Sequence, residues 1–147
     1  MIQKIMNKNL IILNDNDNLE NIAETMKKYD VGMVIIKKNN KIKGLITDRD
    51  IVTKIIANKD NKIKEYLTTD LITIDVNSDV KEAIDLMKKH KIKRLLVKKN
   101  NKLVGVLSLS DLLNTVDNSI LIETYKTIFS INRNTDKYLT DIDEFEL

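Results

Sequence analysis

The sequence of 147 residues has no cysteine, no proline and no tryptophan, and it contains only two phenylalanines. Without cysteine the chain cannot form disulfides, thiolate zinc sites or cysteine nucleophiles, which fits the reducing cytoplasm. With glycine only at Gly32, Gly44 and Gly105, it cannot build the glycine-rich loop of a P-loop or dinucleotide-binding motif. The shortage of aromatic rings argues against the stacking platforms that bind single-stranded nucleic acid.

Long apolar runs are also missing, so the sequence predicts no membrane span, and residues 1–4 do not begin a signal peptide. The net charge of +3 is small beside 25 basic and 22 acidic residues. A dedicated nucleic-acid binder needs a stronger basic excess. Nucleic-acid binding therefore stays an alternative carried only by lysine-rich segments, at residues 37–38, 88–89, 91, 93–94 and 98–99.

Catalytic groups are scarce as well. His90 is the only histidine and stands among lysines at a predicted helix end, where an exposed structural role is favoured. No nucleophile-elbow motif accompanies it, and a zinc site would need further nitrogen or sulfur ligands. We therefore expect neither an enzyme nor a metal site.

What the sequence does contain is an internal duplication. Residues 44–52 and 105–113 both read as glycine, an apolar strand end, a hydroxyl residue, two variable positions, an aspartate and an apolar helix face. The two copies begin 61 residues apart, and the same offset aligns the rest of both halves without a gap. Each half, at about 60 residues, would be only marginally stable alone, so the two should pack together and share a core.

Hydrophobic periodicity predicts the order β-α-β-β-α in each copy, an α/β (α+β) fold. The expected boundaries are repeat 1 at 1–60, repeat 2 at 61–118 and an extension at 119–147. We expect a helix over 120–128 and an acidic end over 136–147. The expected strands are 10–13, 31–36 and 42–46 with 71–74, 92–97 and 103–107; the expected helices are 19–26 and 51–56 with 80–87 and 112–116.

The motifs Thr47-x-x-Asp50 and Ser108-x-x-Asp111 have two interpretations. A hydroxyl residue followed three positions later by an acid is a capping box, which needs no ligand. The same arrangement puts an acid and a hydroxyl at a helix N-terminus, where phosphates bind, and a carboxylate can accept two hydrogen bonds from a ribose diol. The motif taken alone favours the capping box, and its duplication would make two such sites related by approximate symmetry.

Two gapless copies of this motif, each after a hairpin, resemble a CBS-domain pair, also called a Bateman module. The resemblance implies a pseudo-twofold pair of repeats and a non-catalytic regulatory module that senses a metabolite. It implies binding of AMP, ADP, ATP or S-adenosylmethionine in two clefts, no metal, a homodimer and a regulated partner that the sequence does not identify. A scaffold or dimerisation role without ligand remains an alternative.

The resemblance also implies site residues. The first cleft would use Thr47, Asp50, Leu71, Ile72, Ile92, Lys93 and Arg94. The second would use Leu10, Ile11, Val31, Ser108 and Asp111. The positions that match Lys93 and Arg94 are Gly32 and Met33, so we expect the second cleft to lack cations and to bind nucleotides more weakly.

The same resemblance predicts self-association into flat discs. The apolar faces of the second helices would supply a self-complementary interface between two copies. The residues predicted for it are Ile51, Ile55, Leu112 and Val116.

Overall fold

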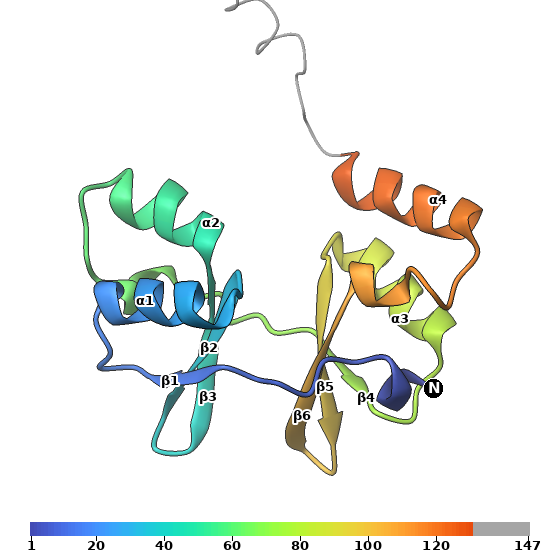
Figure 1. The fold of residues 1–147 in the computed structure, drawn as a ribbon, viewed down its shortest axis with the longest axis horizontal. Helices are drawn as coiled ribbons and strands as arrows, with labels where there is room; N and C mark the ends of the chain where they lie inside the picture. Colours follow the sequence, from blue (N-terminus) through green and yellow to red (C-terminus); the bar gives the residue numbers. More distant parts are fainter. Residues whose placement is uncertain (131–147) are drawn as a thin grey trace, which may run out of the picture.

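Two three-stranded sheets, each covered by helices, make up the computed structural model, which describes residues 1–130 (Figure 1). The strand orders are β1-β2-β3 and β4-β5-β6, so the same topology occurs twice. In each sheet the first pair is parallel and the hairpin is antiparallel. This confirms the predicted duplicated α/β fold. The acidic end expected over 136–147 lies outside the described residues.

The first repeat follows the predicted order, although its first two strands begin two residues later than expected and its third begins one residue earlier. Its elements are β1 (Ile12–Asn14), α1 (Leu19–Tyr29), β2 (Met33–Lys38), β3 (Lys41–Thr47), α2 (Asp48–Asp50) and the π-helical segment η2 (Ile51–Ile56). The helix predicted over 51–56 is therefore present, but a single short α-helical turn introduces it.

The second repeat has the same order, with one difference at its second helix. Its elements are β4 (Thr73–Asp75), α3 (Val80–His90), β5 (Arg94–Lys99), β6 (Lys102–Ser108) and the 3₁₀ turn η4 (Leu109–Leu112). The helix predicted over 112–116 was wrong, since that stretch forms turns after η4. The helix predicted over 120–128 is confirmed as α4 (Asn118–Phe129), which packs beside α3 (Figure 1).

Asparagine takes the place of glycine at the tight turns. In the first hairpin Asn39 and Asn40 both have positive φ (50° and 59°), and Asn100 and Asn101 repeat this in the second. Two successive positive φ angles are typical of the type I′ turn, whose twist matches that of the strands. None of the three glycines has positive φ, so the glycines serve another purpose.

Side chains on the two faces of each central strand belong to different hydrophobic clusters. Val34 and Ile36 of β2 face the first repeat's own helices, whereas Ile35 points the other way. Ile35 meets Leu96 of β5 and Val106 of β6 in a separate cluster that joins the two sheets. Because side chains alternate across a strand, each sheet buries one face on helices and the other on its twin.

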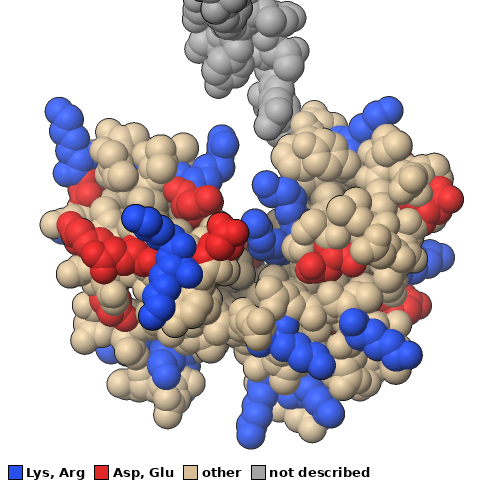
Figure 2. Space-filling model, in the orientation of Figure 1, with Lys and Arg blue, Asp and Glu red and all other residues tan. Residues whose placement is uncertain are grey.

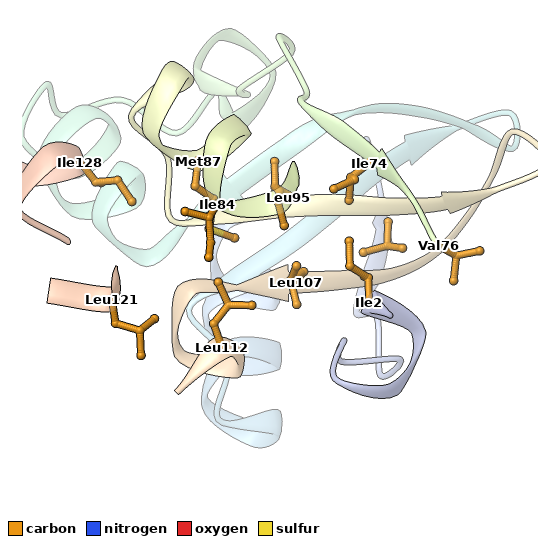
Figure 3. Packing of buried hydrophobic residues seen from close by; sticks show 12 residues of the cluster. Ile2, Ile74, Val76, Ile84, Met87, Leu95, Leu107, Leu112, Leu121 and Ile128 are labelled. Atoms are coloured by element: carbon orange, nitrogen blue, oxygen red, sulfur yellow. The ribbon is translucent and has the colours of Figure 1, made fainter. Parts of the chain in front are cut away.

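The segment before the first strand packs on the second repeat. Ile2 has no exposed surface and lies in the second repeat's core, beside β4 and β6 (Figure 3). Asn7 and Val106 exchange two backbone hydrogen bonds of 2.9 Å. A Cβ at Gly105 would stand 2.9 Å from the carbonyl oxygen of Asn7, so this close approach requires glycine.

The linker before the second repeat packs on the first repeat in return. Ile63 is buried in the first repeat's core. Leu45 and Thr68 exchange backbone hydrogen bonds of 3.0 and 2.9 Å. A Cβ at Gly44 would lie 2.6 Å from the carbonyl oxygen of Thr68. The two repeats thus exchange their leading segments, and the duplicated glycines mark the two crossings.

The predicted dimer interface was wrong in its residues. Ile51 and Ile55, at most 6% exposed, lie in the first repeat's core. Leu112 is fully buried in the second repeat's core, and Val116 is half-buried against it. Their helical periodicity marks the face that covers the sheet of the same repeat, which leaves none of it for a partner. The apolar side chains that these segments do expose are Val52, Ile56 and Leu113.

Candidate functional site

Both hydroxyl–aspartate motifs form complete capping boxes. The Thr47 backbone N–H and hydroxyl donate to Asp50 Oδ2 at 3.3 and 2.9 Å, and the Asp50 N–H donates to Thr47 Oγ1 at 3.1 Å. The Ser108 N–H and hydroxyl donate to Asp111 Oδ2, both at 2.7 Å. The two boxes fix each aspartate just beyond the end of its hairpin, as the sequence predicts.

The second carboxylate oxygen distinguishes the two aspartates. Asp50 Oδ1 accepts from Lys54 Nζ at 2.8 Å. Burial raises the pKa of the Asp50 carboxyl, but hydrogen bonds from Lys54 and Thr47 and the charge of Lys54 outweigh it, so the pKa lies below its ordinary value. Among the described residues, no hydrogen bond or ion pair reaches Asp111 Oδ1. That oxygen can accept a ligand donor directly.

Cleft 1 is a cavity of about 330 Å³ between the end of the first hairpin and the second repeat. Six of the seven residues predicted for it line its wall: Thr47, Leu71, Ile72, Ile92, Lys93 and Arg94. The seventh, Asp50, does not line the wall and lies behind Thr47, whose hydroxyl it holds. The wall is mostly apolar. Its cations, Lys91, Lys93 and Arg94, lie together on the short segment from the end of α3 to the start of β5.

Helix α4 closes part of cleft 1, which the sequence did not predict. Ile128 and Phe129 line the cavity from the last turn of the helix. Lys93 Nζ lies 5.3 Å from the centroid of the Phe129 ring, within the range of a cation–π contact. Farther along, Lys88 of α3 pairs with Glu123 at 2.6 Å. Because α4 has no counterpart in the first copy, the repeat pattern could not place it.

Cleft 2 is a cavity of equal volume, about 330 Å³, on the other side of the pair. All five residues predicted for it line the wall: Leu10, Ile11, Val31, Ser108 and Asp111. Further polar side chains join them at the wall, namely Asn7, Asn9, Asp30 and Ser110. Cleft 2 is therefore the more polar cavity, and it has two carboxylates.

The expectation that cleft 2 lacks a cation was wrong. Arg94 lines cleft 2 as well as cleft 1, and so does Met33. The error came from assigning each side chain to one cleft through the repeat offset. The offset relates Arg94 to Met33, but it does not show that both stand where the two cavities meet. Figure 2 shows basic and acidic side chains on both sides of the hollow between the two halves.

Other kinds of site have little support in the described part of the chain. No group of three or more His, Asp or Glu side chains there could hold a metal ion. No helix within residues 1–130 is long and apolar enough to cross a membrane. His90 is exposed at the end of α3.

Comparison with known proteins gives the family. The CBS domain model matches twice, at residues 2–57 and 63–118. The chain is 30% identical over 114 residues to the CBS domain-containing protein YhcV of Bacillus subtilis, covering 76% of this chain and 81% of YhcV.

Solved structures show the same fold. An uncharacterized conserved protein from Pyrococcus horikoshii matches with a TM-score of 0.71 and 29% identity, over 77% of this chain and 89% of that one. The CBS domain pair of protein MJ0100, solved in complex with 5′-methylthioadenosine and S-adenosyl-L-methionine, matches with a TM-score of 0.70 and 24% identity, over 78% and 93%. The chain therefore belongs to the CBS domain family and is a tandem CBS domain pair.

Proposed function

We propose that this protein is a non-catalytic sensor that binds an adenosine nucleotide or adenosyl ligand in the clefts between its two CBS repeats. One observation carries the proposal. Each cavity combines the hydroxyl residue of one repeat's motif with apolar residues that precede or begin the strands of the other repeat. A ligand in either cleft would touch both repeats, so binding can shift how they pack. The related MJ0100 pair, solved with two adenosyl ligands, supports this ligand class.

Cleft 1 suits a phosphorylated ligand. Leu71, Ile72 and Ile92 would hold the base, and Lys93 and Arg94 would meet the phosphate. A charge-assisted hydrogen bond contributes about 1.5–3 kcal/mol, which is about one to two decades in affinity. For that reason cleft 1 is expected to bind AMP, ADP or ATP much more tightly than adenosine.

The ribose acceptor proposed for cleft 1 is Asp50, which must first release Lys54. An ion pair between positions i and i+4 of a helix is worth only about 0.3–0.5 kcal/mol, and Lys54 is largely exposed. Opening the pair would weaken ligand binding by about twofold. The pair therefore leaves Asp50 available to a ribose diol.

Calorimetric titration with AMP, ADP, ATP, S-adenosylmethionine and adenosine, with GMP as the base control, tests the proposal. We expect at least one adenosine ligand to bind well below 1 mM, and AMP to bind about 10–100-fold more tightly than adenosine. Absence of heat and of thermal stabilisation with all five ligands would favour the scaffold alternative. Equal binding of GMP and AMP would contradict recognition of adenine.

We also propose that two copies associate through the exposed apolar side chains Val52, Ile56 and Leu113. Light scattering at tens of micromolar should give the mass of a dimer. A charge in an apolar interface is costly to bury, so Ile56→Glu should give a monomer. Thr53→Glu, at an exposed polar position of the same segment, is the matched control and should stay dimeric. A monomeric parent protein would refute this interface.

A further inference from the structure

We infer that the two clefts compete for the guanidinium of Arg94, so that a phosphorylated ligand in cleft 1 weakens the binding of a second one in cleft 2. The inference rests on the proposed function, because it concerns how adenosine ligands would occupy both clefts. It adds a regulatory property that comes from one asymmetric position in an otherwise duplicated pair.

Two equivalent positions of the repeats, Met33 and Arg94, carry the inference. Met33 begins β2 and pairs with Thr47, while Arg94 begins β5 and pairs with Ser108. These positions are equivalent under the 61-residue offset. Each of the two side chains lines both cavities. Met33 and Arg94 thus form the wall that clefts 1 and 2 share, and only one of them carries charge.

The charges on either side of this wall are unequal. Cleft 1 has Lys91 and Lys93 in addition to Arg94, against the single carboxylate of Asp70. Arg94 is the only cation among the residues that line cleft 2, where it stands with Asp30 and Asp111. Arg94 is exposed, and no ion pair within residues 1–130 holds it. The guanidinium is therefore free to turn toward a phosphate in either cavity.

Occupation of one cleft then changes the other. A phosphate in cleft 1 would draw Arg94 to the side where Lys93 also stands, and cleft 2 would be left with two carboxylates and no cation. A second phosphate would meet repulsion in place of a charge-assisted bond. By linkage the penalty is the same whichever cleft fills first. A ligand without phosphate forms no charge-assisted hydrogen bond with Arg94 and should bind the two clefts without this coupling.

The test compares AMP with adenosine by calorimetry on the full chain and on Met33→Arg, with Met33→Leu as the uncharged control. The parent should show two AMP events at least about tenfold apart, which is the loss of one charge-assisted contact. Met33→Arg gives the shared wall a second guanidinium, so its second AMP event should tighten at least about tenfold. Met33→Leu should behave as the parent, and adenosine binding should respond to neither change.

Arg94→Met makes the wall symmetric and provides a second measurement if Met33→Arg folds poorly. In this variant the second AMP event should be no tighter than adenosine. Two AMP events that stay equal in the parent, or a second event that Met33→Arg leaves unchanged, would overturn the coupling while leaving the proposed function standing. Tighter binding of the second AMP than the first would also overturn it. Failure of AMP and adenosine to bind any variant would reject both.

Discussion

Replacing Ile2 by alanine is expected to lower the free energy of unfolding by about 2–5 kcal/mol, as for a large apolar side chain removed from a packed core. Ile2 stands outside the strands and helices of the repeat, yet it is fully buried among residues of the second repeat. The cavity left by its side chain would lie beside β4 and β6, whose positions are fixed by hydrogen bonds and cannot collapse around it. Urea denaturation followed by circular dichroism measures the loss.

Gln3→Ala provides the control for Ile2→Ala. Gln3 is the next residue of the same short helical turn and is exposed, so its replacement should change the free energy of unfolding by less than about 0.5 kcal/mol. A loss below about 1 kcal/mol for Ile2→Ala would show that the leading segment does not pack on the second repeat in solution. The exchange of leading segments would then have to be abandoned.

Replacing Asp50 by alanine is expected to weaken the tighter AMP event by at least about 100-fold. The ribose diol would lose two hydrogen bonds to a charged acceptor, each worth about 1.5–3 kcal/mol, and that sum corresponds to two or more decades in affinity. Asp111→Ala should leave the tighter event nearly unchanged and remove the weaker one. Calorimetric titration with AMP measures both, and the opposite pattern would reverse the assignment of the clefts.

Asp48→Ala is the matched control for Asp50→Ala. Asp48 lies on the same helical turn and carries the same charge, but its carboxylate accepts from the Arg49 N–H and does not hold the hydroxyl of Thr47, the cleft-lining residue that Asp50 contacts. If Asp50 serves only as a cap, its removal should cost about 0.5–2 kcal/mol of stability and change no AMP isotherm. Measuring unfolding and binding on the same samples separates the cap from the ribose acceptor.

The sequence predicts most of the local structure here because that structure depends on local periodicity. The spacing of Leu19, Ile22 and Met26 predicts α1, and the asparagine pairs predict the hairpin turns. The capping boxes are also local, since each joins residues three positions apart. The internal duplication adds a check, because each element in one half must recur in the other.

What the sequence does not predict depends on contacts between distant segments. The pattern of residues 1–8 does not tell which repeat they cover, and the glycine at the crossing reads equally well as a strand end. The apolar faces of the segments after Thr47 and Ser108 are visible in the sequence, but whether they meet a sheet or a partner depends on the whole fold. In the structure these faces pack on the sheet of their own repeat, which is why the predicted interface was wrong.

In the candidate clefts too, the sequence predicts the residues of the local motif but not the contacts between distant segments. Residues carried over by the motif are found at the cavity walls, with Asp50 set back behind Thr47. The presence of Arg94 in both cavities follows only from the wall that the two cavities share. Ile128 and Phe129 come from a helix outside the repeat, so no internal comparison could assign them to cleft 1.

The exchanged leading segments predict an order of folding during synthesis. The first repeat can close its core as soon as residue 68 has left the ribosome, because every segment that it needs has then been made. The second repeat is complete only after β6 has been made and residues 1–8 have packed on it, where Asn7 pairs with Val106. Contacts between residues so far apart in the sequence form slowly, because the loop between them must close first. We therefore expect the first repeat to fold before the second.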